Sequence, residues 1–331
     1  MTESNLPDGV DDFDDFDDDD FQPMSNLMEG FEGHRAGFIA IVGRPNAGKS
    51  TLTNALVGHK VAITANQPET TRRIIRGIVQ REDGQLILVD TPGLHRPRTL
   101  LGERLNDMVK ESLSDVDCVA LCLPADEKIG PGDKFLLDLV KKTNAPIVAV
   151  ITKADKISRD DLAMKLIEAD QFGEFAEIVP VSAIEGKQVT LLADLLLAQM
   201  PECPPLYPKD AISDESEEVM ISELIREAAL TDVRDELPHS IAVVVEEMSE
   251  RPRRRGDERP PLTEIHANIF VERDSQKGIV IGRGGSRLKQ VGKDAREGIE
   301  KLLGTRVYLD LHVKVAKDWQ RDPKLLGRLG F

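Results

Sequence analysis

The sequence feature that most constrains the fold is a run of eight residues, Gly-Arg-Pro-Asn-Ala-Gly-Lys-Ser, at positions 43–50. It follows an apolar stretch at residues 38–42 and opens residues 49–57, whose pattern is helical. In such a run the glycines let backbone N–H groups close around phosphate oxygens, and the lysine reaches the β and γ phosphates. A loop of this kind between a strand and a helix predicts a nucleotide-binding α/β fold. The expected phosphate-site residues are Gly43, Arg44, Pro45, Asn46, Ala47, Gly48, Lys49, Ser50 and Thr51.

Apolar runs alternate with helical patterns between residues 38 and 200. Alternation of this kind predicts a doubly wound, mostly parallel sheet of the P-loop type. The expected buried strands are residues 38–42, 86–89, 118–123, 147–151 and 178–181. The expected helices are residues 49–57, 102–113, 131–142, 160–167 and 189–200.

A second unit follows a break at residues 201–210, where four prolines prevent a helix or central strand. Beyond the break we expect a helix at 217–230, strands at 241–247, 264–272 and 307–315, and a helix after Gly285. That order indicates a small α+β domain. The sequence therefore divides into a tail at 1–34, a nucleotide domain at 35–203, a linker at 204–216 and a second domain at 217–331.

Charge is distributed unevenly along the chain, whose formal net charge is -16. Residues 1–34 hold 12 acidic side chains and no Lys or Arg, which predicts a disordered acidic tail. A calcium loop is the alternative there, but the spaced glycine and final glutamate of an EF-hand are missing. Residues 251–331 hold 19 basic and 11 acidic side chains, so only this segment has the positive charge that a polyanion-binding module needs.

The cysteine content and the hydropathy of the chain indicate where in the cell the protein is found. Three cysteines without zinc-type spacing, two of them in an apolar run, are typical of a reducing interior. No apolar stretch approaches the roughly 18 to 20 residues that span a bilayer, and the acidic N-terminus does not resemble a secretion signal. We expect a cytoplasmic protein.

Two further elements follow apolar runs at the positions where a nucleotide-binding sheet needs them. Asp90, with Thr91, Pro92 and Gly93, ends the run at 86–89 and is expected to hold Mg²⁺ together with Ser50. Thr152, Lys153, Ala154 and Asp155 follow the run at 147–151 and resemble the Asn-Lys-x-Asp element of guanine-binding proteins. The resemblance implies that Asp155 selects guanine, that Lys153 covers the base and that Thr152, in place of Asn, ties this loop to the phosphate loop.

The order of these elements resembles the translation-factor-like class of GTPases. In that class a short element like Ser182 and Ala183 contacts guanine O6, and a first switch loop completes the magnesium shell. The corresponding switch residues are Glu69, Thr70, Thr71, Arg72 and Arg73, with Thr71, or alternatively Thr70, as the metal ligand. Leu94 stands where Ras-like proteins have the glutamine that orients the attacking water.

The second domain contains a Gly-x-x-Gly turn that follows the apolar triplet at 279–281 and precedes a basic helical segment. KH domains use such a turn to approach the sugar-phosphate chain of single-stranded nucleic acid. The turn is expected between two helices, and the element order helix, strand, strand, helix, helix, strand resembles a type II, or bacterial, KH domain. The expected RNA-binding residues are Ile281, Gly282, Arg283, Gly284, Gly285, Arg287 and Lys289. The basic loop at 251–255 is either a further phosphate contact or a solvated charge run, and Trp319 either stacks on a base or closes the core.

A GTPase domain followed by this KH pattern resembles the Era family of ribosome-assembly GTPases over residues 36–331. The resemblance implies binding of GTP and GDP, GTP hydrolysis, and binding near the 3′ end of small-subunit (16S) ribosomal RNA during 30S assembly, with no DNA partner. It also implies Mg²⁺ as cofactor, a K⁺ ion held near the phosphates with help from Asn46, and peripheral association with the inner face of the membrane.

Three alternatives stay open on the sequence alone. The first is a non-enzymatic RNA chaperone in which bound GTP is structural. The second is an ATP-driven RNA enzyme, against which Asp155 argues. The third is a signalling GTPase whose C-terminal domain docks a protein.

Overall fold

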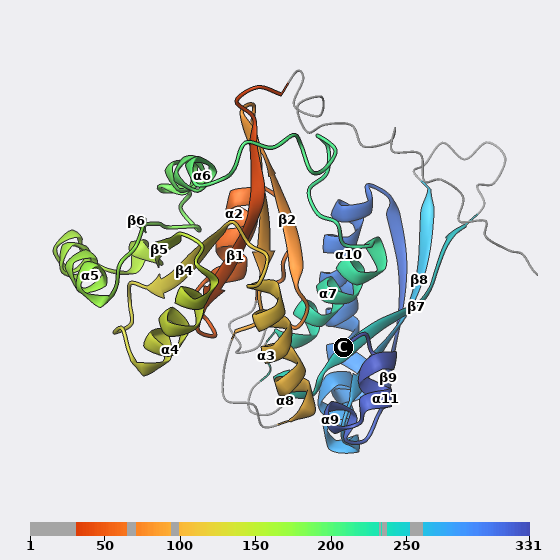
Figure 1. Ribbon diagram of the computed structural model, residues 1–331. Coiled ribbons are helices and arrows are strands. Elements are labelled where there is room, and N and C mark those ends of the chain that lie inside the picture. The colour runs from red at the N-terminus through yellow and green to blue at the C-terminus, as the bar shows by residue number, and fades with distance from the viewer. Residues whose placement is uncertain (1–30, 65–70, 94–98, 232, 234–236, 252–260) are drawn as a thin grey trace, which may run out of the picture.

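The computed structural model describes residues 31–331 except 65–70, 94–98, 232, 234–236 and 252–260. It contains a six-stranded sheet with its helices and a three-stranded sheet with its helices, side by side (Figure 1). The acidic tail and the basic loop therefore fall largely outside the described residues. No helix among the described residues is long and apolar enough to cross a membrane.

The six-stranded sheet has the order β2-β3-β1-β4-β5-β6, with β2 antiparallel to β3 and the other neighbouring pairs parallel. This confirms the doubly wound, mostly parallel sheet. Its strands are β1 (Arg35–Gly43), β2 (Ile75–Gln80), β3 (Gly84–Asp90), β4 (Cys118–Pro124), β5 (Ile147–Thr152) and β6 (Glu177–Pro180). Its helices are α2 (Lys49–Val57), α3 (Leu100–Ser112), α4 (Pro131–Val140), α5 (Arg159–Phe172) and α6 (Val189–Ala198), with 3₁₀ turns η2 (Lys141–Thr143) and η3 (Ala154–Lys156).

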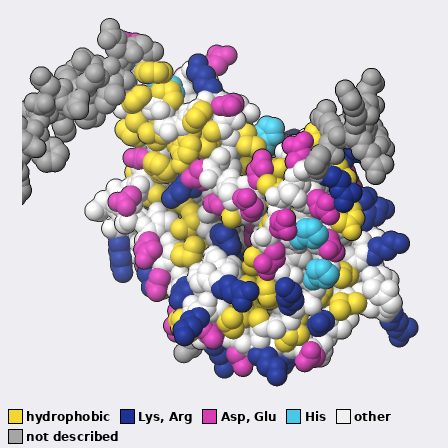
Figure 2. All heavy atoms as spheres, turned by 90° about the vertical axis from the view of Figure 1, so that its right-hand side faces the viewer, with side chains coloured by type: hydrophobic (Ala, Val, Ile, Leu, Met, Phe, Trp, Pro, Cys, Tyr) yellow, Lys and Arg dark blue, Asp and Glu magenta, His cyan; other side chains and the backbone are white. Residues whose placement is uncertain are grey.

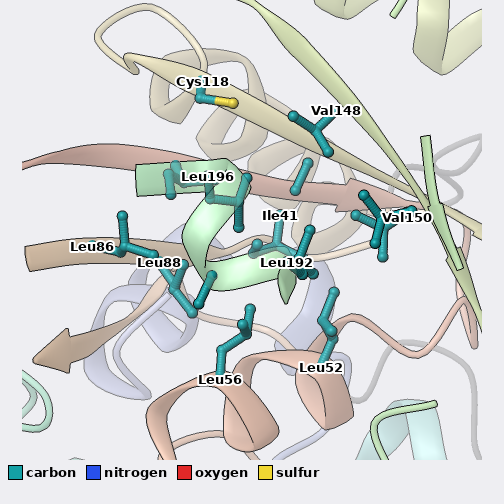
Figure 3. Packing of buried hydrophobic residues seen from close by; sticks show 14 of the residues in the cluster. Ile41, Leu52, Leu56, Leu86, Leu88, Cys118, Val148, Val150, Leu192 and Leu196 are labelled. Carbon is teal, nitrogen blue, oxygen red and sulfur yellow. The ribbon is translucent and has the colours of Figure 1, made fainter. Parts of the chain in front are cut away.

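Each face of this sheet is covered by its own helices because the parallel strands are apolar on both sides. Helices α2 and α6 pack on one face, where Leu52 and Leu56 meet Leu192 and Leu196 (Figure 3). Helices α4 and α5 cover the opposite face together with the C-terminal end of α3. Strand β2 was not anticipated because it lies at the sheet edge, where a short run with an arginine does not show a buried-strand pattern.

The predicted linker does not run free of the nucleotide domain. The backbone N–H of Ile78 donates to the Ile212 carbonyl at 2.9 Å, and the buried Gln85 side chain accepts from the backbone N–H groups of Leu206 and Tyr207. The segment therefore covers the edge strand β2, which otherwise presents unpaired backbone groups to solvent.

Apart from a short additional helix before the first strand, the second domain has the order helix, strand, strand, helix, helix, strand that the sequence predicts for a type II KH domain. Strands β7 (Ala242–Arg251) and β8 (Leu262–Val271) pair antiparallel, and β9 (Arg306–Val315) pairs parallel to β8. The helices are α7 (Glu217–Leu230), α8 (Leu237–Ser240), α9 (Asp274–Ile281) and α10 (Ser286–Leu303), with the 3₁₀ turn η4 (Arg283–Gly285) between the last two. Two elements that the sequence did not predict, η5 (Trp319–Arg321) and α11 (Pro323–Arg328), end the chain.

Trp319 belongs to the core, which settles the choice left open by the sequence. Its side chain is fully buried, its Nε1–H donates to the Ser240 carbonyl at 3.1 Å, and its ring stacks on Phe331 at 5.6 Å between centroids. The same cluster contains Leu101 and Leu105 of α3, so the C-terminal end of the KH domain packs on the nucleotide domain.

The packing in Figure 3 predicts a difference between two neighbouring leucines of α6. Leu192 is fully buried against α2, whereas Leu191 is 43% exposed. Leu192→Ala leaves a cavity and is expected to lower the free energy of unfolding by about 2 to 5 kcal/mol. Leu191→Ala, on the same helix, is the matched control, with a change of less than about 1 kcal/mol. Urea unfolding of both variants measures the difference, and equal losses would contradict the packing.

Candidate functional site

The phosphate loop lies between the end of β1 and the start of α2. Gly48 has φ 87°, a left-handed conformation that favours glycine, and a Cβ there would lie 3.6 Å from Cβ of Thr152. Asn46 is also left-handed, with φ 62°. The left-handed backbone at these two residues turns the loop toward the N-terminus of α2. There, the first N–H groups of the helix and the helix dipole favour an anion.

Lys49 is the first residue of α2, and its side chain turns back to the loop. Its side chain is 6% exposed, and its Nζ donates to the carbonyl oxygens of Gly43 and Arg44 at 3.1 Å each. Burial lowers the pKa of Lys49, while the nearby Asp90 carboxylate opposes that shift. The loop and Lys49 therefore place a buried amine donor beside the N-terminus of α2.

Three oxygen-bearing side chains meet beside the loop, as the sequence predicts for the metal. Ser50 Oγ donates to Asp90 Oδ2 at 2.8 Å and lies 2.9 Å from Thr71 Oγ1, which lies 3.4 Å from the same carboxylate oxygen. Asp90 Oδ1 is buried and accepts no hydrogen bond from the part of the chain that the structure describes. Burial raises the pKa of Asp90 to about 6, while Lys49 and the two hydroxyls lower it. Hydroxyl and carboxylate oxygens around an unsatisfied buried oxygen fit Mg²⁺, which would restore the ionised carboxylate.

The other end of the site is formed by the loop after β5. Thr152 Oγ1 donates to the Ala47 carbonyl at 2.7 Å, so the predicted tie between this loop and the phosphate loop is confirmed. Lys153 has φ 56°, and Ser182 Oγ donates to Asp155 Oδ1 at 2.6 Å. The serine holds one carboxylate oxygen of Asp155, and the carboxylate borders the cavity.

A cavity of about 640 Å³ joins the two ends. Of the residues predicted for the nucleotide, metal and switch roles, those that line it are Pro45, Asn46, Gly48, Lys49, Ser50, Thr51, Thr71, Gly93, Thr152, Lys153, Asp155 and Ala183. Glu69, Thr70 and Leu94 lie outside the described residues, so their predicted roles stay predictions. Six other predicted residues do not line the cavity: Gly43, Ala47, Asp90, Pro92, Ala154 and Ser182.

Arg44 and Thr91 make contacts within the protein. The Arg44 guanidinium donates to the buried Asp133 at 2.7 Å and pairs with Glu127 at 3.1 Å, which directs it toward α4. Thr91 Oγ1 donates to the Ile41 carbonyl at 2.8 Å and fixes the turn after β3 on the neighbouring strand. Both were predicted as nucleotide contacts, which stay predictions, and the structure shows their side chains bound to neighbouring elements of the protein.

Five cavity residues were missed by sequence reasoning: Ile63, Thr64, Glu127, Lys156 and Ile184. Glu127 follows the apolar run of β4, and Ile184 directly follows the predicted Ser182 and Ala183, so position after a strand was a usable signal. No local signal marks Ile63 and Thr64, because their place depends on the other domain.

The three described switch residues, Thr71, Arg72 and Arg73, contact different parts of the protein. Thr71 reaches Ser50 and Asp90, whereas Arg72 and Arg73 turn toward the KH domain. Neither arginine lines the cavity.

The Gly-x-x-Gly turn forms η4 between α9 and α10. Gly282, Gly284 and Gly285 all have left-handed φ, at 74°, 58° and 78°. A Cβ on Gly282 would lie 2.7 Å from Cβ of Arg287, so that position requires glycine. Around Gly284 and Gly285 there is open space, which leaves the N-terminus of α10 accessible to a phosphate.

Charge differs between the two sides of the KH domain. Arg283 and Lys289 are exposed beside the turn. Figure 2 shows the side on which the three-stranded sheet lies, where acidic side chains and histidines gather near the middle. Glu264, His266, Asp310 and His312 belong to β8 and β9, with His266 Nδ1 at 3.2 Å and His312 Nε2 at 3.3 Å from Asp310 Oδ2. The turn is therefore the more favourable approach for a polyanion.

Comparison of this sequence with known protein families supports both the nucleotide site and the Gly-x-x-Gly site. Residues 38–153 match the family model described as 50S ribosome-binding GTPase, and residues 236–320 match the KH domain model. The chain is thus a GTPase that carries a C-terminal KH domain. It is 64% identical over 304 residues to GTPase Era of Streptomyces coelicolor, covering 90% of this chain and 95% of that protein. The chain belongs to the Era family.

Other relatives and solved structures are similar to this chain over both domains. GTPase Era of Mycolicibacterium smegmatis is 59% identical over 300 residues, covering 90% of this chain and 99% of that one. A variant of Aquifex aeolicus Era bound to GDP·AlF4⁻ superposes with a TM-score of 0.83 at 36% identity, covering 89% and 99% of the two chains. Era in complex with MgGDPNP and nucleotides 1506–1542 of 16S ribosomal RNA gives 0.83 at 38% identity, covering 90% and 99%.

The contact of Thr152 with Ala47 predicts the result of removing one hydroxyl. Thr152→Val keeps the shape but removes the only side-chain donor that Thr152 offers to the phosphate loop. We expect the affinities for GTP and GDP to fall together by about tenfold, because a buried carbonyl loses a partner. Thr152→Ser retains the hydroxyl and is the control, with a change of less than about threefold. Fluorescent-nucleotide titration measures both, and an unchanged Thr152→Val affinity would show that the tie is dispensable.

Proposed function

We propose that this Era-family GTPase is a nucleotide-dependent switch that binds the 3′ region of small-subunit (16S) ribosomal RNA through its KH domain and assists 30S assembly. The observation that carries the nucleotide part is the convergence of Lys49, the trio Ser50, Thr71 and Asp90, and Asp155 around one cavity. Hydrolysis takes GTP and water to GDP and phosphate.

In this proposal Ser50, Thr71 and Asp90 would hold Mg²⁺, and the ion would supply positive charge beside the β and γ phosphates. Lys49 and the backbone N–H groups of the loop bind the same phosphates and orient the γ phosphate for attack. The relative solved with MgGDPNP supports the choice of metal.

Asp155 supports guanine as the base. Its carboxylate is held by Ser182, and Asp155 lines the same cavity as Lys49. A carboxylate accepts hydrogen bonds from the N1–H and exocyclic amine of guanine, and adenine offers no matching pair of donors. This disfavours the ATP-driven alternative.

The relative bound to nucleotides 1506–1542 of 16S ribosomal RNA supports the RNA part of the proposal. The glycine turn and the free N-terminus of α10 are suited to a sugar-phosphate backbone. The proposal places the protein in the cytoplasm, where 30S subunits assemble, and peripheral membrane association stays a prediction of the family resemblance.

The RNA proposal predicts that charge at the turn weakens binding. Gly284→Asp adds a carboxylate beside the N-terminus of α10 and is expected to weaken binding of a 16S 3′-end oligonucleotide by about tenfold or more. Gly304→Asp is a matched control, because Gly304 also has left-handed φ, at 65°, and open space, but lies at the other end of α10. Equal affinities of the two variants in a filter-binding titration would favour a protein-docking role for this domain.

The proposal includes K⁺ as a second cation, supported by the position of Asn46 in the wall of the cavity. Single-turnover GTP hydrolysis is expected to be about tenfold faster in potassium chloride than in sodium chloride, because a cation near the phosphates stabilises the charge of the transition state. Asn46→Ala should remove most of this difference. Equal rates in the two salts would exclude K⁺, and no turnover under any condition, with or without RNA, would favour the chaperone alternative.

A further inference from the structure

The segment between α2 and β2 contains the predicted switch residues 69–73 and is called the switch loop below. Both of its described ends are attached to the KH domain as well as to the nucleotide domain. The N-terminal end is residues 61–64 and the C-terminal end is residues 71–73, with residues 65–70 outside the described part of the chain. Thr64 and Thr71, one on each end, line the nucleotide cavity.

The N-terminal end runs from the phosphate-loop helix to the KH core. Asn54 of α2 accepts from the backbone N–H groups of Val61 and Ala62 at 2.9 Å through Oδ1, and its side-chain amide donates to the Ala62 carbonyl at 2.7 Å. The next residue, Ile63, is 3% exposed and belongs to the apolar cluster of the KH domain, with Ile221 and Ile225 of α7.

Glu227 of α7 completes this attachment. Its Oε1 accepts from the Thr64 backbone N–H at 2.9 Å and from Thr64 Oγ1 at 3.3 Å, while Oε2 pairs with Lys60. A carboxylate from the KH domain thus fixes the backbone of a residue in the nucleotide cavity wall.

The C-terminal end is attached through a buried arginine. Arg72 is 1% exposed, its two terminal nitrogens donate to the carbonyls of Ile241 and His239 at 2.7 Å each, and its guanidinium lies 5.8 Å from the Trp319 ring centroid. A guanidinium removed from water is stable only with such partners. Because withdrawal of Arg72 would break both hydrogen bonds to the KH domain, this attachment is costly to release.

We propose that Glu227 and Arg72 are positioning residues for GTP hydrolysis: through Thr64 and Thr71 they hold the two ends of the switch loop against the nucleotide and its metal. Arg72 directly follows Thr71, so its seat in the KH domain fixes the threonine hydroxyl beside Ser50 and Asp90. The KH domain in this way forms part of the hydrolytic site without touching the nucleotide.

Helix α7, which carries Glu227, also contacts the helix that follows the Gly-x-x-Gly turn. Arg287, on the first turn of α10, donates to the carbonyls of Ala229 at 3.4 Å and Thr231 at 2.7 Å, at the C-terminal end of α7. A shift of α10 on binding RNA would therefore act on α7 and on Glu227. This connection alone rests on the proposed RNA function.

The test compares replacements of Glu227 in the full chain with Mg²⁺ and without RNA, so it does not depend on RNA binding. Glu227→Ala removes the acceptor for Thr64 and is expected to slow single-turnover GTP hydrolysis about tenfold, with GTP affinity reduced and GDP affinity unchanged within about twofold. Glu227→Gln keeps one acceptor oxygen and should stay within about threefold of the parent. Glu218→Ala, at an exposed position on the same helix, is the matched control.

Exchanging the charges of Lys60 and Glu227 distinguishes a role of Glu227 in positioning Thr64 from a role in stabilising the fold. Lys60→Glu with Glu227→Lys keeps the ion pair but places a donor opposite the Thr64 N–H, so it should restore thermal stability and leave hydrolysis slow. Arg72→Lys gives an independent arm, because an ammonium does not reproduce the planar pair of hydrogen bonds, and the same loss of preference for GTP over GDP is expected. Parent-like hydrolysis in Glu227→Ala, recovery of the rate in the exchanged pair, or equal losses of GTP and GDP affinity would each overturn the proposal.

Discussion

The carboxyl ends of β1, β3 and β5 meet at one edge of the parallel sheet, and the arrangement of the nucleotide site depends on this meeting. Each of these strands is followed by a loop that leaves the sheet on the same side. Lys49 and Ser50 come from the start of the helix after the first loop, Asp90 from the end of the second strand and Asp155 from the third loop. Ligands bind at such an edge because the loops are free to differ while the buried strands fix their starting points.

The KH domain also has a site suited to phosphate groups, and this site is formed by the Gly-x-x-Gly turn. Its turn must bring the backbone close to a phosphate chain, and three left-handed glycines with open space around two of them make that approach possible. The two sites thus share a physical principle, the N-terminus of a helix preceded by glycine, although one closes around a nucleotide and the other stays open.

The two domains are joined by more than the linker. Ile63 and Arg72 belong to the nucleotide domain by sequence, yet both are buried among residues of the KH domain. Leu101 and Leu105 of α3 pack with Trp319, and Arg104 donates to the Phe331 carbonyl at 2.7 Å. The segments on either side of the metal site therefore contact the domain that carries the Gly-x-x-Gly turn, which gives the two sites a physical means of coupling.

Local order along the chain was sufficient to predict most of the fold and the convergence of the nucleotide motifs. A strand, a glycine loop and a helix are short-range features, and the ends of parallel strands meet by topology, so Lys49, Asp90 and Asp155 were identifiable without coordinates. The antiparallel edge strand β2 and the two terminal elements η5 and α11 were missed because they lack a strong period of their own.

Only the tertiary structure decided which distant residues complete the site. Glu227 and Thr64 are 163 residues apart, and Arg72 and His239 are 167 apart. An isolated glutamate on an amphipathic helix or an arginine in a polar loop reads from the sequence as a solvated charge. Their roles arise from packing between two domains, and no pattern with the period of a helix or a strand encodes such a contact.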